Sequence, residues 1–105
     1  MIYFVQEFDR KPEVTPARMQ EIFKALQEGW EKAWPTNRLV ALYYQRYNLG
    51  GDREYMAIWE MPDWAAFDEW RGFWPQVKDF MQSVEDDFHG SIIHERNRVM
   101  ECLLP

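Results

Sequence analysis

The stretch of sequence that decides the fold is EYMAIWEMPDWAAFDEWRGFW, residues 54–74. Its first third has the composition and alternation of a β-strand, and its remainder repeats aromatic residues at the three- and four-residue intervals of a helix. The change occurs at Pro62 and Asp63, and the stretch contains four of the six tryptophans in the chain. It therefore predicts a strand followed at once by a helix with an aromatic face.

The same reasoning, applied in both directions, predicts four strands, over residues 1–8, 39–47, 54–61 and 94–103. A helix should begin at Thr15 and Pro16, a hydroxyl cap followed by a proline, and end at Pro35. Residues 48–52, which include two glycines, should form a hairpin turn. The second helix should be capped by Asp63, and Pro75 should kink or split it.

The resulting order, β-α-β-β-α-β, predicts a ferredoxin-like α+β fold in one domain over residues 1–105, with a four-stranded antiparallel sheet and both helices on one face. Several strands are apolar on both faces, and an exposed apolar sheet face is rare on a monomer. We therefore expect two chains to pair as a homodimer, sheet against sheet.

Composition narrows the functional class. The formal net charge of -6 and the absence of a basic stripe argue against a nucleic-acid partner. The single cysteine, Cys102, rules out an intramolecular disulfide and fits a reducing compartment. The apolar start of the chain is short and soon reaches Glu7, so we expect no signal peptide, no membrane partner and a cytoplasmic location.

Two local motifs carry a family resemblance. Trp59 and Glu60 end the predicted strand, and Phe67 and Trp70 stand three residues apart on the predicted helix. In these features the chain resembles the dimeric α+β barrel superfamily, especially its antibiotic-biosynthesis-monooxygenase-like domains and, more distantly, its heme-degrading monooxygenases. The resemblance implies a closed barrel of two chains, with a pocket inside the barrel or between each sheet and its own helices.

The heme-degrading members have an asparagine on the first strand, a tryptophan on the second helix and an iron-binding histidine about ten residues later. Trp70 matches the tryptophan, and Gln6 or Glu7 stands near the place of the asparagine. Phe80 stands where the histidine should be, which argues against heme binding because the axial ligand is missing. His89 should lie beyond the end of the helix, where residues 85–87 are interpreted as a solvated acidic terminus.

Neither a metal nor another cofactor is expected. His89 and His94 are the only histidines, whereas zinc and iron sites need three or four converging ligands. No local motif assembles a nucleophilic triad.

The candidate site residues are polar or aromatic side chains of the strands and of the second helix. Glu7 is the candidate catalytic residue, because a desolvated carboxyl has a raised pKa and can act as a general acid or base. The candidate ligand-binding residues are Tyr3, Tyr44, Arg46, Trp59, Trp70 and Trp74. The alternative interpretation is that the charged side chains form ion pairs at edges or interfaces and that the rings fill the core.

Three functions fit these observations. The first is a small-molecule-binding protein, such as a cofactor-independent monooxygenase or an isomerase, that acts on an apolar or aromatic oxygenated compound. The second is a non-catalytic homodimeric binding or stress-associated module, in which the tryptophans pack together and leave no cavity of ligand size. Heme binding or degradation is the third, and Phe80 disfavours it.

Overall fold

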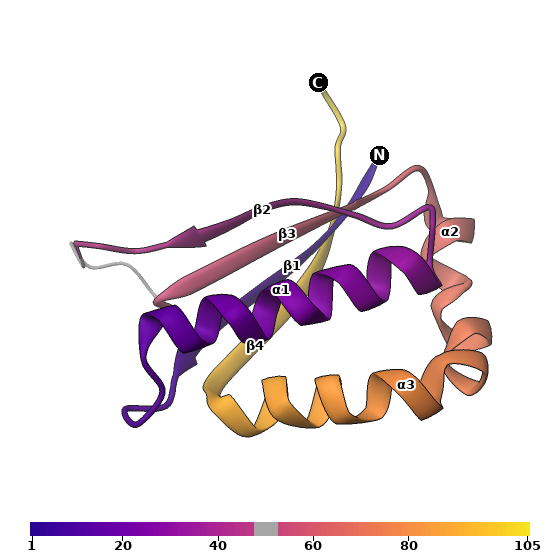
Figure 1. Ribbon diagram of the computed structural model, residues 1–105. Helices are drawn as coiled ribbons and strands as arrows, with labels where there is room; N and C mark the ends of the chain where they lie inside the picture. The colour runs from indigo at the N-terminus through magenta and orange to yellow at the C-terminus, as the bar shows by residue number, and fades with distance from the viewer. Residues whose placement is uncertain (48–52) are drawn as a thin grey trace.

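A computed structural model describes residues 1–47 and 53–105. The elements in chain order are β1 (Ile2–Arg10), α1 (Pro16–Ala33), β2 (Arg38–Tyr44), β3 (Tyr55–Met61), α2 (Trp64–Asp68), α3 (Trp70–Ser91) and β4 (Ile92–Glu101). The strands form one antiparallel sheet in the order β2-β3-β1-β4, and α1 and α3 lie on the same side of it (Figure 1). The predicted ferredoxin-like α+β fold is confirmed, while the predicted turn at residues 48–52 lies outside the described residues.

The first helix begins as its sequence predicts. Thr15 Oγ1 accepts a hydrogen bond from the Arg18 backbone N–H at 3.1 Å, and Pro16 occupies the first turn, where its missing N–H costs nothing. Its buried face consists of Met19, Ile22, Phe23, Leu26 and Trp30. This spacing places α1 against the sheet along its whole length.

The second helical segment is split earlier than predicted. Asp63 Oδ1 caps α2 through the Ala66 backbone N–H at 2.8 Å, as expected. The break falls at Glu69, so Pro75 lies inside α3 rather than at the division. The predicted helix end at residues 85–87 is also wrong, because α3 continues to Ser91, although Asp86 and Asp87 are exposed as expected. The longer helix carries His89 on its last turn, next to the sheet.

Strand register decides which side chains meet the helices. Phe4 lies opposite Trp59, and Gln6 lies opposite both Ala57 on β3 and Asn97 on β4. Since side chains on paired residues project to the same face, these positions share the helix-covered face with the core residue Phe8. The register therefore places two amide side chains, Gln6 and Asn97, on a face that is otherwise rich in rings.

The opposite face of the sheet is not covered by any described helix (Figure 1). It carries apolar residues such as Val5, Ile58 and Tyr43, of which Val5 is buried and Tyr43 is 55% exposed. It also carries Arg96 and Arg98 of β4, so it is less apolar than the sequence pattern indicates. Within residues 1–47 and 53–105, no helix is long and apolar enough to cross a membrane.

Candidate functional site

A cavity of about 320 Å³ lies between the helix-covered face of the sheet and helices α1 to α3. This volume falls at the lower end of the range of about 300–1,000 Å³ that is typical of small-molecule sites. Its aromatic wall consists of Phe4, Trp30, Trp34, Trp59, Phe67 and Trp70, and its polar wall consists of Gln6, Asn37, Glu85, His89, Glu95 and Asn97. A ring-lined space with a few convergent polar groups is the usual composition of a ligand pocket.

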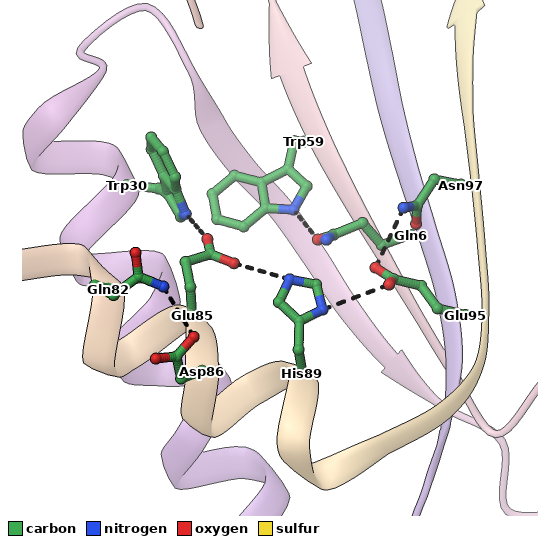
Figure 2. Close-up of polar contacts among 9 residues, drawn as sticks. All are labelled: Gln6, Trp30, Trp59, Gln82, Glu85, Asp86, His89, Glu95 and Asn97. Carbon is green, nitrogen blue, oxygen red and sulfur yellow. Dashed lines mark hydrogen bonds and ion pairs between the residues drawn. The ribbon is translucent and has the colours of Figure 1, made fainter. Parts of the chain in front are cut away.

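His89 stands between two carboxylates at the mouth of this cavity (Figure 2). Its Nε2 is 3.0 Å from Glu85 Oε2, one helical turn earlier on α3, and its Nδ1 is 3.5 Å from Glu95 Oε1 on β4. The histidine side chain is 51% exposed, whereas that of Glu85 is 18% exposed. The two contacts, of which the one to Glu85 is the shorter, hold the imidazole in one orientation.

Glu85 is itself held from the opposite side. Its Oε1 accepts a hydrogen bond from the Trp30 indole N–H, while its Oε2 contacts His89 (Figure 2). Because both carboxylate oxygens are engaged, the Glu85 side chain has little freedom to rotate. The chain of contacts from Trp30 through Glu85 to His89 therefore connects α1 to the cavity mouth.

A second contact fixes the amide of Gln6. The Trp59 indole N–H donates to Gln6 Oε1 at 2.7 Å, and the Gln6 residue is only 8% exposed. An indole nitrogen is a donor and never an acceptor, so the partner atom must be the Gln6 oxygen rather than its nitrogen. The Gln6 NH₂ group is thereby left as a hydrogen-bond donor on the cavity wall.

Glu7, the predicted catalytic residue, lies on the opposite face of the sheet. Burial opposes its charge, but hydrogen bonds from Arg98 and Arg96 and their positive charges outweigh burial and lower the pKa of Glu7. The expectation of a raised pKa is wrong because sequence alone does not show two arginines on the neighbouring strand converging on one carboxylate. Glu7 forms ion pairs with Arg96 and Arg98, as the alternative interpretation of the charged strand residues predicts.

Comparison with known proteins places the chain in a family. The NIPSNAP family model matches residues 10–103. The chain belongs to the NIPSNAP family. No curated protein matches it.

Several solved structures share the fold of this NIPSNAP chain at low sequence identity. An Arabidopsis thaliana protein is 14% identical with a TM-score of 0.72, covering 100% of this chain and 98% of its own. SnoaB, a cofactor-independent oxygenase from Streptomyces nogalater, is 18% identical with a TM-score of 0.65, covering 99% and 94%. A dimeric ferredoxin-like protein of unknown function from Thermobifida fusca is 13% identical with a TM-score of 0.68, covering 96% and 90%.

These likenesses show the ferredoxin-like fold that the sequence predicts.

The other predicted ligand-binding residues of the NIPSNAP chain do not form one common site. Trp59 and Trp70 line the cavity, and Trp74 stacks on Trp30 beside it with a ring-centroid distance of 5.9 Å. Tyr3 pairs with Glu60 and faces the other side of the sheet together with Glu7. Tyr44 and Arg46 line a separate groove of about 790 Å³ between α1 and β2. A single pocket that unites Glu7 with Trp59 is therefore excluded by the strand geometry.

His89 differs from its sequence-based interpretation, because it lies inside α3 rather than beyond the end of the helix. Phe80 is 52% exposed and does not line the cavity, whereas His89 does. His94 lies outside the cavity, where its Nδ1 contacts Asp9 Oδ2 at 2.9 Å. Across the described parts of the chain, no group of three or more His, Cys, Asp or Glu residues has a metal-binding arrangement.

Sequence reasoning missed Trp30, Glu85, His89 and Glu95 as cavity residues, although a signal for two of them existed. Glu85 and His89 are four residues apart, which places both on one face of any helix that continues to residue 91. That signal was hidden by the interpretation of residues 85–87 as a helix terminus. The positions of Trp30 and Glu95 depend on helix packing and strand register.

Proposed function

We propose that this chain binds a small oxygenated aromatic compound in the sheet–helix cavity and removes a proton from it. The observation that carries the proposal is His89, held between Glu85 and Glu95 at the mouth of a ring-lined cavity. The rings supply a flat apolar surface on which an aromatic ligand can stack. The histidine supplies a base that is positioned by its neighbours.

The contacts assign a role to each nitrogen of the base. Both carboxylates accept only, and Glu85 is the nearer, so in the neutral imidazole the hydrogen lies on Nε2 and the lone pair lies on Nδ1, 3.5 Å from Glu95. Nδ1 takes the proton of the bound compound, and the imidazolium that forms is stabilised by Glu85 on one side and Glu95 on the other. Glu85 is thus a positioning residue, comparable in role to a carboxylate behind a catalytic histidine.

The anion left on the compound needs a donor as well as a base. The Gln6 NH₂ group, whose orientation is set by Trp59, lies on the same wall of the cavity. A buried donor that is already oriented stabilises developing negative charge without further reorganisation. In this proposal the Gln6 NH₂ group donates to the carbonyl oxygen attached to the ring system, onto which the negative charge of the anion is delocalised.

A cofactor-independent oxygenase is a second candidate, and the likeness to SnoaB favours it. The deprotonated compound would react with O₂, so that one oxygen atom enters the ring system as a carbonyl and the other leaves as water. With anthrone the balance is anthrone plus O₂ giving anthraquinone plus water. The same base serves this reaction and a simple isomerisation, which differ only in what captures the anion.

The cavity also bears on the alternative of a non-catalytic module. That alternative predicts tryptophans packed together with no space of ligand size, whereas Trp30, Trp59 and Trp70 border a cavity of about 320 Å³. The cavity supports the pocket function.

We infer further that two chains pair through the uncovered sheet face, which carries Ile58 and the exposed Tyr43. Closing this face removes its apolar side chains from water. Light scattering tests the pairing. A dimer that Ile58→Asp converts to monomer supports it, and a wild-type monomer contradicts it.

The proton-removal step is tested with anthrone under anaerobic conditions, by following deuterium exchange at its acidic ring CH₂ by NMR. The His89→Asn variant should exchange at least about 10²-fold more slowly than wild type, the usual contribution of a positioned base. His94→Asn is the matched control, because His94 lies outside the cavity, and it should exchange at the wild-type rate. Equal rates in all three proteins would refute the role of His89. Admission of air then distinguishes the oxygenase, which must form anthraquinone, from an isomerase.

A further inference from the structure

The groove between α1 and β2 is separate from the cavity described above. Helix α1 lies alongside β2, the outer strand of the sheet (Figure 1), and a groove of about 790 Å³ runs between them. None of the residues that line this groove also lines the cavity that contains His89. Its volume lies within the range of about 300–1,000 Å³ that is typical of small-molecule sites. The groove therefore has room for a ligand of its own.

The groove is elongated. Its lining residues extend from Pro16 to Gln27 on α1 and from Leu39 to Tyr44 on β2. Since a helix rises about 1.5 Å per residue and a strand about 3.3 Å, each wall is about 17 Å long. At one end the Leu39 backbone N–H donates to Glu31 Oε1 at 2.9 Å, and this bond joins the two walls. An extended chain matches such a groove better than a compact ring system does.

The floor of the groove is apolar and rests on the core. Phe23 of α1 is only 1% exposed. Leu42 and Tyr44 of β2 lie opposite Ala57 and Tyr55, so their side chains project to the helix-covered face. The Tyr44 ring packs against that of Tyr55 with a centroid distance of 5.1 Å, yet Tyr44 remains 43% exposed. An apolar ligand in the groove would remove this surface from water, which is favourable.

The charged residues that line the groove are both cations. Lys24 comes from the helix wall, and Arg46 lies just beyond the end of β2. Among the described residues, no Asp or Glu lines the groove, although the chain as a whole has a formal net charge of -6. Glu31, at the end near Leu39, is engaged by the Leu39 N–H and by the Gln27 amide. The groove therefore attracts an anion, at the end opposite Leu39.

We propose that this groove is a second binding site, and that its ligand is an alkyl carboxylate with a long chain. The carboxylate binds Arg46, whose planar guanidinium matches it with paired hydrogen bonds, and Lys24 adds positive charge from the other wall. The alkyl chain lies over Tyr44 and Leu42 in the direction of Leu39. This inference is independent of the proposed function, because the groove and the cavity have no lining residue in common.

Calorimetric titration of the full chain with three compounds tests the two parts of the ligand. Dodecanoate has the head group and the chain, dodecyltrimethylammonium has the same chain with the opposite charge, and acetate has the head group alone. All are used below their micelle-forming concentrations. Dodecanoate should bind about tenfold more tightly than dodecyltrimethylammonium, the effect of two partly screened cations, and acetate should not bind measurably.

The comparison of the two amphiphiles is a demanding one. The net charge of the protein favours the cationic compound, so a preference for dodecanoate must arise locally. Equal affinity for the two compounds, or no binding of dodecanoate, would overturn the proposal.

A pair of substitutions locates the site. Lys24→Gln combined with Arg46→Gln should weaken dodecanoate binding about tenfold, because both attractive charges are lost. The matched control combines Lys78→Gln with Arg71→Gln, which changes the net charge equally on α3, outside the groove. All four residues are exposed, so both proteins should fold. The control should bind dodecanoate as tightly as wild type, and equal weakening in both pairs would overturn the site.

Chain length provides a test that needs no variant. Octanoate should bind the wild type about tenfold more weakly than dodecanoate, which is about twofold for each half-buried CH₂ group that it lacks. Equal affinity for the two carboxylates would overturn the position of the alkyl chain.

The His89→Asn variant separates the groove from the cavity. It should bind dodecanoate as tightly as wild type, since His89 does not line the groove. Weaker binding in His89→Asn, without weaker binding in the Lys24 and Arg46 double variant, would place dodecanoate in the cavity and overturn the groove site. The proton-removal function is judged separately, by anthrone exchange, and stands or falls without this result.

Discussion

Trp59 donates its indole hydrogen to Gln6 Oε1 over 2.7 Å, and this contact determines which end of the Gln6 amide is free to act as a donor. If that donor stabilises an anion, Gln6→Leu should slow anthrone deuterium exchange by about 10²-fold, as loss of one such donor does elsewhere. Trp59→Phe should have a smaller effect, because the amide remains but can rotate. In steady-state measurements Gln6→Leu should lower kcat. A change in KM alone would contradict the role of Gln6 in stabilising the anion.

Glu85 holds His89 through the 3.0 Å contact to Nε2, so removing its charge should affect catalysis through orientation. We expect Glu85→Gln to lower kcat by about 10- to 100-fold, the usual effect of a lost orienting group behind a functional histidine. Asp86→Asn is the control, because Asp86 lies on the exposed side of α3 and contacts Gln82. The kcat of Asp86→Asn should match wild type, and an equal loss in both variants would indicate a general effect of charge.

Glu7 should contribute to stability in a pH-dependent way. Its pKa is lowered from an ordinary value of 4.5 because, against the opposing effect of burial, Arg98 and Arg96 favour the charged form in the folded protein. The stabilisation is therefore complete above pH 4.5 and is lost as the pH falls through the lowered value. At pH 7 the free energy of unfolding of Glu7→Gln should be about 1 kcal/mol lower than that of wild type. The effect is small because solvent screens the partly exposed arginines.

This difference between wild type and Glu7→Gln should shrink as the pH is lowered from 5 to 3, in urea titrations at each pH. A difference that stays constant over this range would show that the ion pairs contribute nothing that titrates.

Gly29 is a position where α1 packs closely against Met81 of α3. A Cβ at this position would lie 2.3 Å from Met81 Sδ, and Met81 is fully buried. Gly29→Ala should therefore destabilise the protein by about 1–2 kcal/mol despite the better helix propensity of alanine.

The same exchange at Gly90, where a Cβ meets nothing within 4 Å, should stabilise α3 by up to about 1 kcal/mol. Combining Gly29→Ala with Met81→Ala should remove the clash, so the two changes together should cost less than their sum. Additive losses in thermal unfolding would contradict the close approach.

Much of the fold could be predicted because it depends on local signals. Thr15, Pro16 and Asp63 mark helix starts through capping chemistry, and these are confirmed. The split at Glu69 and the continuation of α3 to Ser91 were not predicted, because helix ends are set partly by the packing that follows them.

The candidate site was predicted only in part, and the particular residues explain why. Trp59 and Trp70 were assigned to the pocket from their place in an aromatic pattern, and the structure brings both to the cavity. Glu7 was predicted as the catalytic residue because a desolvated carboxyl can have a raised pKa, and its neighbour Gln6 was given no role in the pocket. Adjacent residues of a strand lie on opposite faces of the sheet, so only one of Gln6 and Glu7 can face the cavity, and that residue is Gln6.

The sequence by itself determined the order of strands and helices, because periodicity and capping act over a few residues. Tertiary structure alone decided that Gln6 faces the helices while Glu7 meets two arginines, and that Trp30, Glu85, His89 and Glu95 converge from two helices and an edge strand. Such convergence depends on strand register and on the packing of α1 against α3, which join residues more than fifty positions apart. The aromatic stretch at residues 54–74 established the scaffold, and the opposite ends of the chain provided the candidate chemistry.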